Sequence, residues 1–341
     1  MPTVLVTGGA GYIGTHILVV LAQAGYDCVC IDNYSNSSPA AIARVKELAG
    51  EERITAYDAD IRDAERLREV FARHAIDSVI HMAGLKAVGE SVAQPQRYHD
   101  NNVEGTRILL EALSATRARK FVFSSSATVY GPATKMPVAE DTPTSPQSPY
   151  GRNKLDIEHM LAALAGRDAS WRVVNLRYFN PVGAHPSGRI GEDPSGIPNN
   201  LMPFVCQVAA GRLERLDIWG NDYPTPDGTG VRDYIHVLDL AEGHVAALRA
   251  LERMQPGSVA TVNLGTGRGY SVLELVSAFE KANGVAIARR FAPRREGDVA
   301  VCYADASLAR RLLGWEARRG IDEMCRDAWN WQRRNPRGFQ Q

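Results

Sequence analysis

Short β-branched runs alternate with longer stretches of helical pattern over the first half of the chain. These runs predict β-strands at residues 4–6, 28–31, 54–57, 78–80, 121–123 and 173–176. The stretch between any two runs is long enough for a crossover helix, so we expect parallel strands that are buried on both faces. The pattern therefore predicts an α/β fold built on a doubly wound parallel sheet.

The pattern changes after Asn180, where Pro- and Gly-rich loops are mixed with single strands and helices. The loops lie at residues 181–198 and 221–230, and a later strand and helix lie at residues 261–264 and 271–282. We expect a first domain over residues 1–180 and a smaller, loop-rich ligand-binding lobe over residues 181–341. Some segments of the second half are expected to return to the first domain.

The charge balance excludes some classes of partner. Lysine and arginine together number 39, as do aspartate and glutamate, so the formal net charge is zero. No global field would draw the protein to nucleic acid or to an anionic membrane. No apolar run approaches the ~18 residues that a membrane helix needs, and no signal-peptide pattern precedes the first strand. The absence of both patterns predicts a cytoplasmic protein. The five cysteines are scattered without metal-site spacing, which predicts reduced thiols, no disulfide and no bound metal.

A glycine trio, Gly8, Gly11 and Gly14, follows the first predicted strand and opens an apolar helix pattern. Glycines at these places allow a tight turn and a close approach of a pyrophosphate to the helix N-terminus, as in Rossmann-type domains. The second predicted strand ends in Asp32, 18 residues after Gly14. A carboxylate there accepts hydrogen bonds from ribose hydroxyls and repels a 2′-phosphate, so NAD is favoured over NADP. A glycine-rich turn followed by an unrelated aspartate is the plainer alternative.

Two further strand ends agree with a dinucleotide that lies along the carboxyl edge of the sheet. Asp60 and Ile61 follow the third predicted strand, and Met82, Ala83 and Gly84 follow the fourth. Small residues at the fourth strand end would let the dinucleotide come close. Each segment taken alone is also typical of a plain turn.

A Tyr-x-x-x-Lys pair offers candidate proton chemistry. Ser148 and Pro149 are typical of the N-cap and first position of a helix, which places Tyr150 and Lys154 one turn apart on one face. A cation near 4 Å at an effective dielectric of 20 contributes roughly 4 kcal/mol, or about three pKa units, to deprotonation of a phenol. We therefore expect Lys154 to make Tyr150 a usable base.

The fifth predicted strand ends in the serine run Ser124 to Ser126. One of these hydroxyls is placed to share a hydrogen bond with Tyr150 and a substrate oxygen, and we favour Ser126. Plain strand-end capping remains the alternative, because the sequence does not show which hydroxyl points inward.

The glycine trio, the strand-end serine and the Tyr-x-x-x-Lys helix together resemble the extended short-chain dehydrogenase/reductase family. Longer stretches resemble its UDP-galactose 4-epimerase (UDP-glucose 4-epimerase) branch, and the likeness runs from Thr3 to about Pro336. These stretches are residues 83–91, 124–131, 177–186, 198–201, 230–236 and 293–298. The resemblance implies an NAD-dependent isomerase that interconverts UDP-galactose and UDP-glucose by C4 oxidation, rotation of a 4-keto intermediate and re-reduction. It also implies a homodimer that serves galactose metabolism and nucleotide-sugar supply.

The same resemblance implies roles for individual residues. Ser126, Tyr150 and Lys154 would be catalytic. The residues that would contact NAD are Gly8, Gly11, Tyr12, Ile13, Gly14, Asp32, Asn33, Asp60, Ile61, Met82, Ala83, Gly84, Lys86, Asn101, Ser126, Tyr150, Lys154 and Phe179. The residues that would contact the UDP-hexose are Lys86, Ser126, Tyr150, Asn180, Asn200, Leu201, Trp219, Arg232, Arg295, Asp298 and Cys302.

Elementary chemistry agrees with the UDP assignment. Arg232 and Arg295 can neutralise a diphosphate with forked hydrogen bonds, Asp298 can accept from a ribose hydroxyl, and Trp219 can lie against uracil. Two plainer alternatives remain. In the first, Trp219 packs in the core. In the second, the basic run of Arg289, Arg290, Arg294 and Arg295 forms only a solvated face.

Two rival functions also remain. A nucleotide-sugar 4,6-dehydratase shares the first oxidation, but its family places an Asp-Glu pair after the strand-end Ser or Thr, where this chain has Ala127 and Thr128. A catalytically silent dinucleotide sensor would lack Tyr150 or Lys154, and both are present.

Cys302 bears on the size of the substrate. By the resemblance, the residue four places after Asp298 borders the sugar pocket. Members of the enterobacterial type carry Tyr there, whereas members with a small residue also accept N-acetylated sugars. A thiol in place of a phenol ring leaves room for an acetamido group, which predicts activity on UDP-N-acetylglucosamine and UDP-N-acetylgalactosamine. In the alternative, Cys302 is a core thiol and Tyr303 fills the gap.

Overall fold

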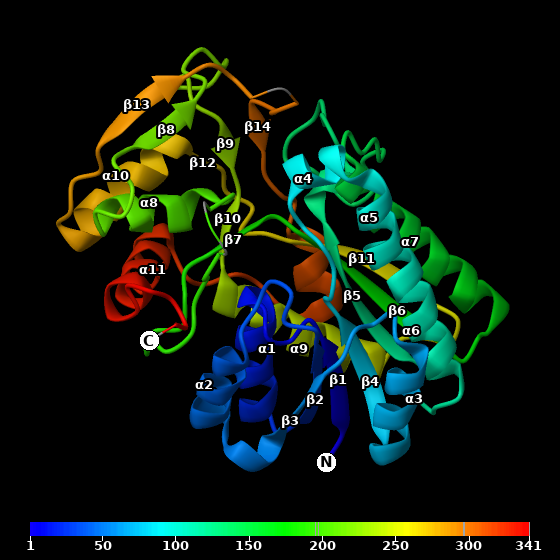
Figure 1. Cartoon of the computed structure of the whole chain (residues 1–341). Helices are drawn as coiled ribbons and strands as arrows, with labels where there is room; N and C mark the ends of the chain where they lie inside the picture. The colour runs from blue at the N-terminus through cyan, green and yellow to red at the C-terminus, as the bar shows by residue number, and fades with distance from the viewer. Residues whose placement is uncertain (195, 197, 296, 341) are drawn as a thin grey trace.

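The central sheet has seven parallel strands in the order β11-β6-β5-β4-β1-β2-β3 (Figure 1). A computed structural model describes residues 1–194, 196, 198–295 and 297–340. The strands are β1 (Thr3–Thr7), β2 (Asp27–Asp32), β3 (Ile54–Asp58), β4 (Ile76–His81), β5 (Lys120–Ser126), β6 (Arg172–Tyr178) and β11 (Val259–Leu264). All six strands expected from the first half are confirmed, and β11, from the second half of the chain, forms one edge of the same sheet.

Helices cover both faces of this sheet, which explains why most residues of its central strands are buried. On β1, Val4 and Val6 belong to the core that includes α1, α2 and α9, whereas Leu5 between them belongs to the core that includes α3, α6 and α7. The short helices α4 (Val88–Ala93) and α5 (Pro95–His99) precede α6. The covering helices are α1 (Tyr12–Gln23), α2 (Pro39–Ala49), α3 (Ala64–Arg73), α6 (Gly105–Ser114), α7 (Pro149–Arg167) and α9 (Val237–Leu251).

A second lobe lies beyond the carboxyl ends of the strands (Figure 1). Its core is formed mainly by α8 (Leu201–Ala209), α10 (Val272–Asn283) and α11 (Ile321–Arg334). Short strands complete it, in the pairs β7 with β10 and β8 with β13 and in the trio β12-β9-β14. These strands are β7 (Asn180–Val182), β8 (Leu216–Trp219), β9 (Val231–Arg232), β10 (Tyr234–His236), β12 (Tyr270–Ser271), β13 (Arg289–Ala292) and β14 (Val301–Cys302).

The described part of the chain has no helix that is both long and apolar enough to cross a bilayer. All five cysteines carry free thiols, and each except Cys302 is buried. Within the same residues, His, Cys, Asp and Glu side chains form no group of three or more that could hold a metal ion.

Candidate active site

The glycine trio forms a tight turn between β1 and α1 that leaves no room for larger side chains. Gly8 adopts a φ of 69°, and a Cβ atom on it would lie 2.8 Å from the backbone nitrogen of Ala83. A Cβ atom on Gly14 would collide with the carbonyl oxygen of Gly8. Helix α1 begins at Tyr12 with Gly11 as its N-cap, so its first N–H groups have no partner within the helix. The turn therefore has the geometry of a pyrophosphate cradle.

Acidic residues stand at the ends of the next two strands, as the sequence predicts. Asp32 ends β2 and accepts a hydrogen bond from the backbone N–H of Ala10 at 2.9 Å, which ties it to the glycine turn. Asp60 follows β3 and accepts a bond from the Asn33 amide at 2.9 Å. A forked pair of bonds from Arg62 lowers the pKa of Asp60 to about 2. Because β2 and β3 are adjacent parallel strands, both carboxylates lie on the same edge of the sheet.

Helix α7 carries the Tyr-x-x-x-Lys pair and begins where the sequence predicts. Ser148 caps it by accepting a hydrogen bond from the Gly151 N–H at 3.1 Å, and Pro149 is its first residue. Tyr150 and Lys154 follow on successive turns. The cap and the proline thus set the position of both functional side chains along the end of β5.

Burial controls the proton affinity of this pair. It raises the pKa of Tyr150 to about 12, and the Ser126 hydroxyl beside the phenol opposes that rise. Burial also lowers the pKa of Lys154 to about 8. The Lys154 ammonium donates a hydrogen bond to the carbonyl oxygen of Ser124 at 2.5 Å. Burial therefore outweighs the other influences on the pKa of Tyr150, because the phenolate loses its hydration and the Lys154 ammonium is directed at Ser124.

The three serines at the end of β5 have different partners. Ser124 offers its carbonyl oxygen to Lys154, and the Ser125 hydroxyl donates to Glu158 at 2.5 Å. Ser126 lies beside Tyr150 and also accepts a bond from the Thr128 N–H at 3.2 Å. Ser126 therefore combines the active-site position that we favoured with the capping role of the alternative.

A cleft in the second lobe brings together residues that the resemblance assigned to the UDP-sugar. Its lining includes Asn180, Asn200, Leu201, Trp219, Arg232, Arg295 and Asp298. These residues come from β7, the start of α8, β8, β9 and the loop after β13. Glu296, within the matching stretch 293–298, lies outside the described residues. Tertiary packing thus assembles one site from five separate segments.

The charged side chains of the cleft are partly paired already. An Arg232 nitrogen lies 3.2 Å from an Asp298 carboxylate oxygen, and the Arg295 guanidinium lies 4.8 Å from the centre of a Trp219 ring. Trp219 is 39% exposed, so plain core packing does not describe it. The four arginines of the basic run differ in their surroundings. Arg295 lines the cleft, whereas Arg289, Arg290 and Arg294 form exposed ion pairs.

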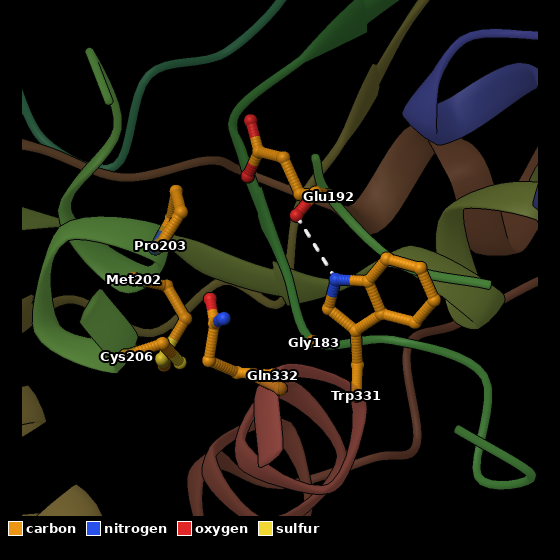
Figure 2. Close-up of a pocket in the computed structure, with 8 residues that line it drawn as sticks. Gly183, Glu192, Met202, Pro203, Cys206, Trp331 and Gln332 are labelled. Carbon is orange, nitrogen blue, oxygen red and sulfur yellow. Dashed lines mark hydrogen bonds between the residues drawn. The ribbon is translucent and has the colours of Figure 1, made fainter. Parts of the chain in front are cut away.

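Glu192 was not predicted, and it joins the two parts of the site. Its carboxylate accepts a hydrogen bond from the Asn200 amide at 2.7 Å and lies 3.4 Å from the Lys86 ammonium. Figure 2 shows the Glu192 main-chain oxygen accepting a bond from the Trp331 indole, over 3.1 Å, which anchors the loop on α11. Lys86 is 106 residues away in sequence, so no local pattern could indicate this contact.

Two more residues at the site were not predicted. The Asn102 side chain bonds to the backbone N–H and carbonyl of Leu85 at 2.8 and 3.0 Å, whereas Asn101, which the resemblance implied, is half-buried next to it. Tyr223 lines the cleft, and its buried hydroxyl has no hydrogen-bond partner among the described residues. An unpartnered buried hydroxyl is a feature of tertiary packing that no local sequence pattern indicates.

Cys302 lies on β14 in register with Arg232 of β9. Its half-buried side chain packs against a small core that includes Phe179, Tyr130 and Val138. It is not among the described residues that line the cleft. Cys302 is thus in register with Arg232, expected at the diphosphate, and packs against the cluster that contains Phe179, expected at NAD.

Known proteins resemble this chain over nearly its whole length. Residues 5–328 match the family model described as GDP-mannose 4,6 dehydratase. The UDP-glucose 4-epimerase of Bacillus subtilis is 58% identical over 98% of this chain and 98% of its own, and that of Drosophila melanogaster is 54% identical over 99% and 98%.

Solved structures give the same result. A UDP-glucose 4-epimerase from Stenotrophomonas maltophilia with bound NAD and formylated UDP-arabinopyranose has a TM-score of 0.96 and 51% identity, covering 99% of each chain. The UDP-glucose 4-epimerase of Bifidobacterium longum in complex with NAD+ and UDP has a TM-score of 0.94 and 53% identity, covering 98% of this chain and 99% of its own. This chain therefore belongs to the UDP-glucose 4-epimerase family of the extended short-chain dehydrogenases/reductases.

Proposed function

We propose that this chain is an NAD-dependent epimerase that interconverts UDP-glucose and UDP-galactose. The observation that carries the proposal is the junction between the Tyr-x-x-x-Lys helix and the nucleotide-sugar cleft. Ser126 pairs with Tyr178 across β5 and β6, and Asn180, two residues beyond Tyr178, lines the cleft. Proton-transfer groups and a charged nucleotide site therefore meet at one edge of the sheet.

The cofactor edge fits NAD. The glycine turn admits no Cβ atom at Gly8, the start of α1 offers unpaired N–H groups, and Asp32 supplies the carboxylate that binds ribose hydroxyls. Bound NAD would accept a hydride from C4 of the sugar and return it to the other face, and its positive charge would favour the Tyr150 phenolate. We assign the remaining cofactor contacts to the residues that the resemblance named.

The residues of the chain would perform the proton steps. Tyr150 takes the proton of the C4 hydroxyl and returns it after the sugar has turned, while Ser126 holds the C4 oxygen. Lys154, as an ammonium ion, stabilises the phenolate form of Tyr150. A phenol whose burial raises its pKa to about 12 needs such cations before it can act as a base.

The cleft would hold UDP firmly and the hexose loosely. Arg232 and Arg295 bind the diphosphate, Asp298 accepts from the uridine ribose, and Trp219 stacks on uracil. A 4-keto sugar must rotate between the two hydride transfers. Binding energy is therefore placed on the nucleotide, remote from the reacting carbon.

A 4,6-dehydratase is the nearest rival, since the matching family model carries that description. A dehydratase needs an additional acid and base for water elimination. The short turn Ala127–Val129 follows Ser126 and contains no carboxylate. The sensor alternative has no support, because Tyr150 and Lys154 lie together at the site.

Four finer assignments complete the proposal. The half-buried thiol of Cys302 supports activity on N-acetylated UDP-sugars, and the more distant Campylobacter jejuni structure, 34% identical with a TM-score of 0.84, is described as a UDP-Glc/GlcNAc 4-epimerase. Family resemblance supports a homodimer. The five free thiols support a cytoplasmic location. We also infer an NAD-binding domain over residues 1–180 and a mainly UDP-sugar-binding lobe over residues 181–341, with β11 in the sheet of the first domain and α9 packed on that sheet.

Incubation of the purified chain with UDP-galactose, without added cofactor, tests the proposed function. We expect UDP-glucose to accumulate to equilibrium. A 4-keto-6-deoxy product would assign the chain to the dehydratases, and the absence of any new sugar nucleotide would refute both activities.

A further inference from the structure

A buried ion pair lies one helical turn beyond Lys154. Glu158 follows Lys154 by four residues on α7, and Arg177 reaches it from β6. The guanidinium donates two hydrogen bonds to the carboxylate, one at 3.0 Å to Oε1 and one at 2.6 Å to Oε2. Ser125 donates a third bond to Oε1 at 2.5 Å. The side chains of Arg177 and Glu158 are only 7% and 6% exposed.

We propose that Glu158 is a positioning residue that keeps Lys154 charged and directed at Ser124, and thereby sets the pH range in which Tyr150 can exchange its proton. The inference rests on the proposed function for the role of Tyr150. The three hydrogen bonds described for the Glu158 carboxylate go to Ser125 and Arg177. Its effect on Lys154 is therefore electrostatic.

The environment of Lys154 explains why a fixed negative charge matters there. The ammonium is buried, and the carbonyl of Ser124 satisfies one of its three N–H donors. Burial lowers the pKa of Lys154, and the Glu158 carboxylate opposes that fall. The forked bonds from Arg177 and the bond from the Ser125 hydroxyl hold the Glu158 carboxylate, so its charge stays at a constant place relative to the ammonium.

Other titratable groups around α7 do not replace Glu158. From β4, His81 is neutral, because burial lowers its pKa to about 3. Glu90 and Tyr98, from α4 and α5, bond with each other at 2.8 Å. Tyr150 lies on the preceding turn of α7, with its ring centre 5.8 Å from the ammonium. In the neighbouring segment, Asp100 and Glu104 accept hydrogen bonds from Gln96 and Arg107.

The wild type, Glu158→Gln and a double variant carry different charges at this ion pair. Comparing them distinguishes a positioning role of Glu158 from simple structural support. Glu158→Gln keeps the size of the side chain and leaves Arg177 without its counterion, so Lys154 faces an unopposed cation. The double variant Glu158→Leu/Arg177→Met removes both charges, and such replacement of a whole buried pair is often tolerated. We expect the pKa of Lys154 to be highest in the wild type, lower in the double variant and lowest in Glu158→Gln. The fall in Glu158→Gln should be at least about one unit.

NMR titration of ¹³C-labelled lysine in the full chain, as purified, measures this directly. The chain has six lysines, and Lys154→Arg identifies the Lys154 signal. The readout needs no turnover, so it remains valid if the chain fails to epimerise UDP-galactose. If Glu158→Gln does not fold, the smaller fall in the Lys154 pKa expected for the double variant still tests the proposal.

A matched control is Asp239→Asn, which weakens a second ion pair, between the buried carboxylate of Asp239 and Arg319. It should reduce stability and leave the Lys154 titration unchanged. In active variants the alkaline limb of kcat should move by the same number of pH units as the NMR titration. An unshifted Lys154 signal in folded variants, or an equal shift in Asp239→Asn, would overturn the proposal.

Discussion

The Lys154 ammonium lies 5.8 Å from the centre of the Tyr150 ring and bonds to the carbonyl of Ser124. Burial moves the two groups away from ionisation, since it raises the pKa of Tyr150 to about 12 and lowers that of Lys154 to about 8. Burial therefore opposes ionisation of both groups, and cationic charge beside the phenol would favour its phenolate form.

Replacement of Tyr150 by Phe tests its role as the proton acceptor. The ring and its packing remain, but the exchangeable proton is lost, so kcat should fall by roughly 10²-fold or more. UDP affinity, measured by calorimetry, should change little because the nucleotide binds elsewhere. Tyr26→Phe, on the connection between α1 and β2, is the control and should keep full activity. Near-normal turnover of the Tyr150 variant would remove this residue from the mechanism.

The alkaline side of the pH profile should report on Lys154. With a pKa of about 8, the ammonium form predominates below that pH and is lost as the pH rises through it. Since the ammonium stabilises the Tyr150 phenolate, kcat should decline above about pH 8. Steady-state rates at saturating UDP-galactose from pH 6 to about pH 10 measure this. A flat profile across that range would contradict the role of Lys154.

The cofactor should stay bound through purification. An epimerase regenerates NAD in each cycle and has no reason to release it, so denaturation in clean buffer should liberate NAD(H) at about one per chain. Asp32→Asn should lower that yield, because it weakens the acceptor for the ribose hydroxyls. Asp27→Asn, at the opposite end of β2, is the matched control. Protein that purifies empty and consumes added NAD stoichiometrically would be incompatible with the epimerase assignment.

Substitution of Cys302 by Tyr should separate the two classes of substrate. A phenol ring there would crowd an acetamido group at a strain of about 1–3 kcal/mol, so kcat/KM for UDP-N-acetylglucosamine should fall about tenfold to a hundredfold. The value for UDP-galactose should change little, and Cys302→Ser should keep both activities. Equal loss of both activities, or a wild type inert toward acetylated sugars, would show that Cys302 does not gate the pocket.

The sequence is a good guide where contiguous residues determine the structure. The strand runs, the Ser148 cap and the glycine turn each depend on neighbours within a few positions, and all lie where the sequence predicts. The strand-end position of Asp32 follows in the same way. Because the strands are parallel, every crossover returns the chain to the edge of the sheet where the strands begin. All strand ends therefore lie at the opposite edge.

Tertiary structure alone decided the rest of the site, because its contacts join residues far apart in the chain. Glu192 meets Lys86 across 106 positions, and Arg177 meets Glu158 across 19. Proton affinity is also a tertiary property. The sequence by itself determined that Tyr150 and Lys154 share a helix face, but only packing decided that both are buried and that the ammonium turns to Ser124, because the hydration of a charge depends on everything folded around it.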